Sequence, residues 1–198
     1  MLMGTGNLTE LTDADSVGVT AVLLGICSEL AIRNVLVVQV SPHTRRTLQE
    51  HDAARRIMYA AAADHSLPRG YGRALLQVHD QKPFPYTSAE IAEISAQVKD
   101  DNYRIEAGED GIHVYNRAGH FVAQAAFALF NKLGVETDGA HAFYLGAELT
   151  KAEIAFQLGK RYAQDEPLDW GCATDSRVED RTRLSDAGHT LRSQAASE

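Results

Sequence analysis

Hydrophobic positions up to about residue 65 alternate between helical and strand spacing. Residues 16–31 carry apolar side chains every three or four positions, which predicts a helix that buries one broad face. Residues 34–40 (NVLVVQV) form a nearly unbroken aliphatic run, typical of a parallel strand covered on both faces. Residues 44–64 are alanine-rich with charges on one side and predict a second helix. The apolar positions of the first helix are Val19, Val22, Leu23, Ile26 and Leu30.

The order of turn, helix, strand and helix is typical of βα repeats in a parallel α/β fold. The motif GTGN, residues 4–7, falls where a preceding strand would end and its βα loop would begin. Glycines there permit close approach of the backbone to a ligand, and side chains of such loops point into the mouth of an α/β barrel. Asn7 is therefore the candidate ligand contact, because a carboxamide both donates and accepts hydrogen bonds. The alternative interpretation is a structural turn, in which Asp13 and Asp15 stabilise the N-terminus of the next helix.

After Leu67 the pattern changes to shorter, mixed segments. Two runs that alternate in polarity are joined by GEDG and predict a β-hairpin. Thr87 or Ser88 followed by Glu90 is typical of a helix N-terminus with a capping box. In chain order we expect a strand at 75–79, a helix at 88–100, hairpin strands at 103–107 and 112–116, a helix at 121–133, and a last helix from about His141 or Ala147 to Tyr162.

A second stretch with candidate chemistry covers residues 146–171, where charged side chains lie beside aromatic ones. This density of charge suggests a substrate site. Glu148 and Lys151 are spaced as helical neighbours, so ion pairing on a helix surface is the alternative explanation. Both interpretations stay open at this point.

Composition and charge narrow the class of protein. The chain has 198 residues and a formal net charge of -8, with 27 acidic against 19 basic side chains. This balance repels a phosphate backbone, so we expect no nucleic-acid partner. No apolar run approaches the roughly 20 residues that span a membrane, and the cytoplasm is the expected compartment. The eight histidines form no HxH or HExxH motif, and the two cysteines lie far apart, so neither a metal site nor a disulfide is expected.

Two long stretches carry a family resemblance. They are GTGNLTELTDADSVGVTAVLLGICSELAIRNVLVVQVSPHTRRTLQEHDAARRIMYAA near the start and AFYLGAELTKAEIAFQLGKRYAQDEPLDWG near the end. They resemble dihydropteroate synthase-like proteins of the branch associated with tetrahydromethanopterin, and the resemblance covers residues 1–171. It implies an α/β fold, made of the last βα units of a TIM-type pterin-binding barrel and a small α+β C-terminal extension. The implied domains are the barrel part at 1–66, the extension at 67–171 and, from the polar composition, a disordered tail at 172–198.

The resemblance also implies a ligand and a set of contacts. Asn7 would contact the pterin ring, with Gly4, Gly6 and Ser41 as further pterin-binding positions. Ser41 stands where folate-pathway synthases carry an arginine-x-histidine pair, so the chain departs from that pattern. Pterin is the implied ligand, and no separate cofactor, metal or catalytic residue is implied.

The implied reaction is transfer of a pterin-methyl group to an aryl amine, in the biosynthesis of tetrahydromethanopterin or folate-type cofactors of one-carbon metabolism. GTGN would follow the seventh barrel strand and NVLVVQV would be the eighth, so we expect this chain to be a C-terminal fragment that is inactive alone. Its partners would be a pterin and either a second copy or the missing part of the barrel. The alternative is a non-catalytic module that binds a pterin or a protein.

Overall fold

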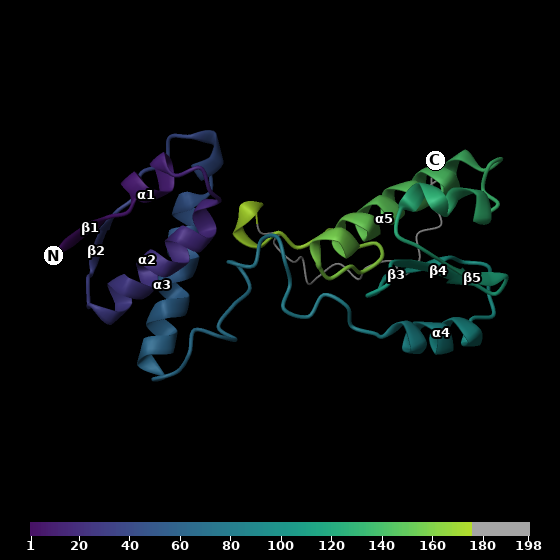
Figure 1. Ribbon diagram of the computed structural model, residues 1–198, viewed down its shortest axis with the longest axis horizontal. Helices are drawn as coiled ribbons and strands as arrows, with labels where there is room; N and C mark the ends of the chain where they lie inside the picture. The colour runs from purple at the N-terminus through teal and green to yellow at the C-terminus, as the bar shows by residue number, and fades with distance from the viewer. Residues whose placement is uncertain (176–198) are drawn as a thin grey trace, which may run out of the picture. The chain divides into compact units, whose positions relative to one another are not determined.

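The computed structural model describes residues 1–175, which form two compact units (Figure 1). Unit 1 contains Met1–Val78 together with residues 169–175, and unit 2 contains His79–Leu168. Residues 169–175 join unit 1 because the N–H of Cys172 donates a 2.7 Å hydrogen bond to the carbonyl of Ala74. The expected tail at 172–198 therefore begins within a described part of the chain, and its residues 176–198 lie outside the described residues.

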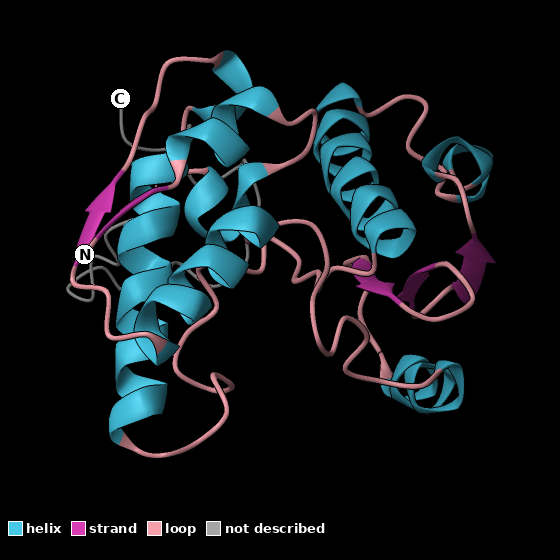
Figure 2. Cartoon of the chain, turned by 60° about the vertical axis from the view of Figure 1, so that its left-hand side comes forward, coloured by secondary structure: helices cyan, strands magenta, loops and turns pink. Residues whose placement is uncertain are grey.

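Unit 1 contains the predicted helix, strand and helix after a short first strand (Figure 2). The loop expected at GTGN is wrong in part, because an additional helix begins at Gly6. Its strands pair in parallel, with Met3 opposite Val35, and the helices between them form the crossover. The strand predicted at 34–40 is shorter in the structure and ends at Leu36. Its partner, residues 2–4, pairs through only three residues before the chain enters a helix at Gly6. The elements are β1 (Leu2–Gly4), α1 (Gly6–Leu11), α2 (Ser16–Glu29), β2 (Asn34–Leu36), a 3-10 turn (Pro42–Thr44) and α3 (Thr47–Ala63).

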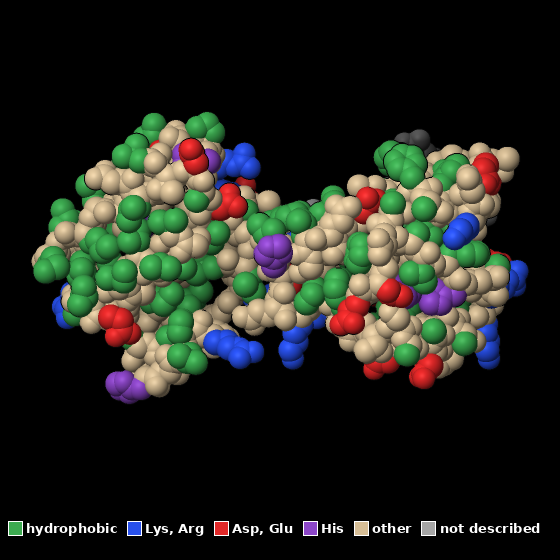
Figure 3. All heavy atoms as spheres, in the orientation of Figure 1, with side chains coloured by type: hydrophobic (Ala, Val, Ile, Leu, Met, Phe, Trp, Pro, Cys, Tyr) green, Lys and Arg blue, Asp and Glu red, His purple; other side chains and the backbone are tan. Residues whose placement is uncertain are grey.

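One face of the β1–β2 sheet packs on the helices. Met3 and Val35 lie against a core formed by Leu23 and Leu24 of α2 and Ala54 of α3. On the opposite face, Leu2 and Leu36 are 64% and 56% exposed. The prediction that both faces of this strand are covered is therefore wrong for the described residues. Figure 3 shows hydrophobic side chains gathered on the surface of the part of unit 1 that holds β1 and β2.

The buried face of α2 differs from the predicted apolar stripe. Val22 and Ile26 are exposed, whereas Thr20 is fully buried. The β1–β2 strand pair that α2 covers is only three residues long. The helix therefore buries fewer apolar positions than the predicted stripe contains. Of the other predicted stripe positions, Leu23 is buried and Val19 packs against the core, whereas Leu30 is exposed at the end of the helix.

Unit 2 is built on a three-stranded antiparallel sheet in the order β3-β4-β5. The predicted hairpin of β3 and β4 is confirmed. The predicted helix at 121–133 is wrong, because the chain turns tightly between Asn116 and Gly119 and returns as a third strand along β4. The predicted strand at 75–79 is not formed either. The elements are α4 (Ser88–Gln97), β3 (Arg104–Ala107), β4 (Ile112–Asn116), β5 (Gly119–Ala123), 3-10 turns at Ala126–Ala128 and Phe130–Lys132, and α5 (Gly139–Leu158).

The two faces of this sheet have different chemistry, and Figure 1 shows α4 and α5 on opposite sides of it. The α5 side is the apolar core of the unit, in which Ile105, Val114, Leu145 and Leu149 are buried together. The α4 side carries ionisable residues, among them the buried His113, the second residue of β4. Alternation along each strand separates the two sets.

Both long helices of unit 2 have the signals expected at their ends. Thr87 and Glu90 form the predicted capping box at the start of α4. Asp138 caps α5 by accepting a hydrogen bond from the N–H of His141. The last helix ends at Leu158, earlier than predicted, because Gly159 adopts a left-handed conformation that closes it. Both sheets are open, so the described chain is a mixed α/β protein and not a closed barrel.

Candidate functional site

The carboxyl ends of β1 and β2 lie at one edge of the unit 1 sheet, since the two strands are parallel. Ligands of parallel α/β proteins bind at such edges, on the loops that follow the strands. The chain leaves β1 directly into α1, which begins at Gly6. It leaves β2 through residues 37–41 into the 3-10 turn that begins at Pro42. These two connections form the candidate site.

Glu10 of α1 holds the two connections together. Its carboxylate accepts hydrogen bonds from the backbone N–H groups of Val40 at 2.7 Å and Ser41 at 3.0 Å, and from the hydroxyl of Thr44 at 2.7 Å. Hydrogen bonds from Ser41, Thr44 and Val40 lower the pKa of Glu10 to about 2. Glu10 is therefore an ionised clamp that fixes the chain after β2 against the helix after β1.

Asn7 lies in the first turn of α1, on the helix that Glu10 joins to Ser41. Asn7 is exposed, and its side chain makes no hydrogen bond to any described residue. Its carboxamide is free to contact a ligand in the described structure. Ser41 is half-buried, with its N–H bonded to Glu10 and its carbonyl accepting from the backbone N–H of Thr44 at 3.1 Å.

The two glycines of the motif have different surroundings. A Cβ atom on Gly6 would lie 2.7 Å from Cγ2 of Val38, so no larger residue fits there without movement. A Cβ atom on Gly4 would meet nothing within 4 Å. Close packing against Val38 therefore accounts for Gly6 without a ligand. Gly4 lies at the end of β1, opposite Leu36, and packing does not account for it.

Buried polar contacts anchor the ends of both strands to α3. Thr5 donates its N–H to the carbonyl of Leu36 at 3.0 Å, and its hydroxyl lies 2.9 Å from Nε2 of His51. The other ring nitrogen of His51 lies 2.7 Å from the carbonyl of Thr47. Burial lowers the pKa of His51, which favours the neutral ring with Nδ1–H donating to Thr47 and Nε2 accepting from Thr5. This triad has a structural role.

A polar cavity of about 220 Å³ lies in unit 1, near the N-termini of α2 and α3. Glu50 is buried in its wall and accepts hydrogen bonds from Ser16 at 2.6 Å and Gln77 at 3.1 Å. Arg46 donates to the carbonyl of Ala173 at 3.1 Å and pairs with Asp175 at 2.8 Å. The cavity is lined by Asp15, Ser16, Pro42, His43, Arg45, Arg46, Glu50, Gln77 and Ala173.

Charges of both signs in this cavity suit a polar ligand that carries donors and acceptors. Sequence reasoning did not assign it, because its wall combines two helix starts with residues 77 and 173. One sequence signal could have indicated this cavity. It is the pair of arginines at 45 and 46, which follows the predicted strand shortly after its Ser41-Pro42 end.

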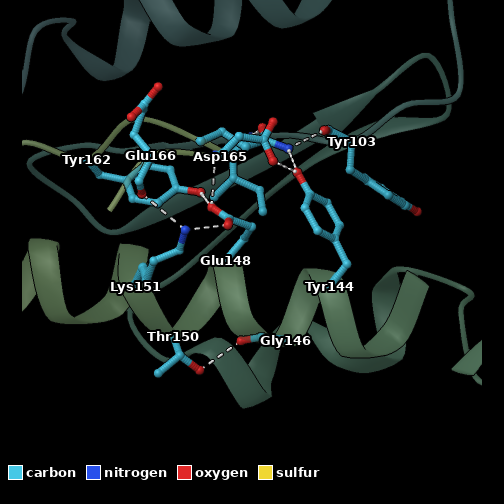
Figure 4. A network of polar contacts seen from close by, with 11 residues as sticks. Tyr103, Tyr144, Gly146, Glu148, Thr150, Lys151, Tyr162, Asp165 and Glu166 are labelled. Carbon is cyan, nitrogen blue, oxygen red and sulfur yellow. Dashed lines mark hydrogen bonds and ion pairs between the residues drawn. The ribbon is translucent and has the colours of Figure 1, made fainter. Parts of the chain in front are cut away.

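The stretch at 146–171 forms a closed polar network (Figure 4). Glu148 is buried on α5 and accepts hydrogen bonds from the hydroxyl of Tyr162 at 2.7 Å and the N–H of Asp165 at 3.2 Å. Lys151 pairs with the other carboxylate oxygen of Glu148. Tyr144 donates to Asp165 at 2.7 Å. The predicted Glu148–Lys151 pair is confirmed, and both oxygens of Glu148 have partners within the protein, which favours the structural interpretation.

Unit 2 also has an apolar groove of about 530 Å³ between its 3-10 turns and α5. Phe127 and Phe143 are 94% and 80% exposed. Thr150 carries the one polar side chain among the described lining residues, and its hydroxyl donates to the carbonyl of Gly146 at 2.8 Å. The lining residues are Ala126, Phe127, Phe130, Leu133, Val135, Ala142, Phe143, Leu145, Gly146, Ala147, Leu149 and Thr150. Sequence reasoning missed this groove because it placed 121–133 in a helix.

Within residues 1–175, no group of three or more histidine, cysteine, aspartate or glutamate side chains is arranged to hold a metal ion. Cys27 and Cys172 are free thiols. No helix in the described part of the chain combines the length and apolar character needed to cross a membrane.

The chain is similar to a protein of Methanocaldococcus jannaschii named "Uncharacterized protein MJ0107". The two are 28% identical over 186 residues, which cover 83% of this chain and 35% of the relative. The chain thus spans about a third of the length of the curated relative that it matches. No protein-family model matches the chain, and no solved structure matches it. The name of the relative assigns it no activity.

Proposed function

We propose that this chain forms the C-terminal part of a dihydropteroate synthase-like pterin-binding protein. One observation carries the proposal: Asn7 and Ser41 follow neighbouring parallel strands, and Glu10 fixes their two connections together. In this proposal the free carboxamide of Asn7 contacts the pterin ring, whose edge offers both donors and acceptors. Gly4 and Ser41 would line the same site, and Gly6 would hold α1 close to the chain after β2.

The rest of a TIM-type barrel would come from a longer polypeptide. Three features support this part of the proposal: β1 and β2 have unpaired outer edges among the described residues, one sheet face exposes Leu2 and Leu36, and the matched relative is nearly three times as long as the matched stretch. The complete protein would transfer a pterin-methyl group to an aryl amine. This chain alone would bind a pterin and not catalyse the transfer.

Fluorescence titration of the chain with 6-hydroxymethylpterin tests the proposal. Replacing Asn7 by alanine should weaken binding about tenfold or more, since it removes a buried hydrogen-bonding group from the complex. Asn131 is exposed in unit 2, so Asn131→Ala is the matched control and should bind as the wild type does. A wild-type chain that binds no pterin, or an Asn7→Ala variant of unchanged affinity, would rule out the proposed contact.

A non-catalytic module that binds a pterin or a protein is the second candidate. The self-contained core of unit 2, in which α5 covers one sheet face and α4 the other, favours it. The two candidates differ in association, because an incomplete barrel should pair through its open strand edges. Sedimentation of the chain over a range of concentrations separates them: self-association supports the barrel part, and a monomer at all concentrations supports the module.

A further inference from the structure

The aromatic side chains of the unit 2 groove lie outside the apolar core of that unit. They are Phe127, Phe130 and Phe143. From the same segment as the first two, Leu129 and Leu133 are buried in the core. The N–H of Ala126 donates a 2.8 Å hydrogen bond to Glu153, which holds the 3-10 turns against α5. The turns are thus anchored without the three phenylalanine rings, which are left for another contact.

The α5 wall of the groove lacks the charges of an ordinary solvent-facing helix surface. Four exposed residues of α5 recur every three or four positions and therefore form one stripe. None of the four is charged, whereas a helix face in contact with water is typically charged or polar. Leu145 and Leu149 lie on the buried face of the same helix. The exposed stripe consists of Phe143, Gly146, Ala147 and Thr150.

Ridges and a hollow lie side by side in this groove. Phe127 and Phe143 are the ridges, at 94% and 80% exposed. Gly146 marks the hollow, since a Cβ atom there would meet nothing within 4 Å. Both features belong to one patch, so two copies of the chain related by a twofold axis present ridges to hollows in both directions. The groove can therefore be covered by a second copy of itself.

The exposed aromatic surface is large enough to hold two copies together. A phenylalanine buries about 200 Å² on average, so the exposed fractions of Phe127, Phe130 and Phe143 leave about 400 Å² to be covered in each chain. Two copies would cover about 800 Å² of aromatic surface, or about two thirds of the roughly 1,200 Å² that a stable interface buries. Ala147 and Thr150 are also exposed in the lining and supply part of the remainder.

Charge and composition favour a second copy as the occupant. Lys132 and Glu136 are exposed beside the lining residues and carry opposite signs, and Asp138 pairs with His141 at 2.6 Å. Two copies that meet here do not set charges of a single sign against each other. Residues 176–198 match the groove less well, because they include no aromatic residue and only three aliphatic residues larger than alanine.

We propose that this groove is an interface between two copies of the chain, related by a twofold axis, in which Phe127 and Phe143 of each copy fill the hollow beside Gly146 in the other. The interface lies within unit 2 and depends neither on the pterin site nor on the open strand edges of unit 1. Pterin binding can therefore fail while the dimer forms, and the reverse.

Sedimentation equilibrium of the full chain over a range of concentrations tests the dimer. The wild type should reach twice the mass of one chain. Phe127→Ser removes a ridge that the fold does not use and should weaken the dimer about tenfold or more. Gly146→Gln puts a long polar side chain into the hollow and should weaken it as well, without strain on α5, because glutamine is a good helix former.

The matched control is Tyr59→Ser, which removes a 77% exposed aromatic side chain from α3 of unit 1. It should associate as the wild type does. Pairing through β1 and β2 of unit 1 would survive both groove variants, so these variants also show which unit causes any association.

A wild type that stays a monomer at all concentrations would overturn the proposal. A dimer of unchanged strength in Phe127→Ser or in Gly146→Gln would do the same, because the chain would then associate through another surface. In a monomeric chain, binding of the dye 8-anilinonaphthalene-1-sulfonate that is lost in Phe127→Ser would assign the groove to an apolar ligand in place of a second copy.

Discussion

The hydroxyl of Thr44 donates a 2.7 Å hydrogen bond to Oε1 of Glu10, 34 residues earlier in the chain. The same oxygen accepts from the N–H of Val40, and the second oxygen accepts from the N–H of Ser41. One carboxylate thus determines how the connection after β2 lies against α1. The relative position of Asn7 and Ser41 therefore depends on the charge of Glu10.

Protonation of Glu10 should loosen this connection. The pKa of Glu10 is about 2 in the folded chain against an ordinary value of 4.5, so its stabilising contribution is complete above about pH 4.5 and is lost as the pH falls toward 2. Urea unfolding of the wild type and Glu10→Gln at several pH values measures this. The wild type should be the more stable above pH 4.5, and the difference should shrink as the pH falls below that value.

Other carboxylates titrate in the same range, among them Asp100, whose pKa hydrogen bonds from Arg104 lower to about 2. Only the difference between wild type and variant isolates Glu10. Glu29→Gln, at an exposed position at the end of α2, is the matched control for the loss of one charge. A gap between wild type and Glu10→Gln that stays constant with pH would show that the carboxylate does not act as an ionised clamp.

Gly6 and Gly4 should respond differently to the same substitution. A Cβ atom on Gly6 would lie 2.7 Å from Val38, so Gly6→Ala should cost about 1–3 kcal/mol through overpacking. A Cβ atom on Gly4 meets nothing within 4 Å, so Gly4→Ala should be neutral or stabilise the chain by up to about 1 kcal/mol. Urea unfolding of the two variants is the measurement. Equal effects at both positions would contradict the close packing of α1 against Val38.

Local rules account for the parts of the fold that the sequence predicted. The 3.6-residue spacing located α2, the alternation in polarity located β3 and β4, and the Thr87–Glu90 pair located the start of α4. Each of these signals lies within one element or one tight turn. They are readable because the side chains that carry them are neighbours in sequence.

The errors arose where distant residues decide the structure. Residues 37–40 have the composition of a strand but no strand to pair with among the described residues, so β2 stops at Leu36. Phe121 is apolar enough for the expected helix, but pairing with Val114 of β4 draws it into β5. The spacing of α2 also gave no sign that Val22 would be exposed.

The candidate site also has a part that the sequence predicts and a part that depends on contacts between distant residues. The position of Asn7 and Ser41 after two neighbouring strands could be predicted, since it follows from the order of elements. The clamp of Glu10 and the cavity beside Glu50 depend on contacts between residues more than 25 positions apart, which no local pattern reveals.

Removal of a single hydroxyl tests the structural interpretation of the network around Glu148. Tyr162 is 3% exposed and donates a 2.7 Å hydrogen bond to Glu148, and burial raises the pKa of Tyr162, so the phenol stays a donor at neutral pH. Tyr162→Phe keeps the ring and removes the donor. It should cost about 1–3 kcal/mol of unfolding free energy, because a buried carboxylate oxygen loses a partner.

The matched control is Tyr144→Phe, which removes a hydroxyl that donates to Asp165 at 2.7 Å near the surface and accepts from the half-buried Gln164 at 2.9 Å. Burial raises the pKa of Tyr144 to about 12, so this phenol is also a donor at neutral pH. Water can replace the lost bond at the exposed Asp165, so the cost should be below about 1 kcal/mol. Urea unfolding at neutral pH compares the two variants. If Tyr162→Phe proved as stable as the wild type, Glu148 would not hold α5 to residues 162–166, and the stretch would again be a candidate for substrate chemistry.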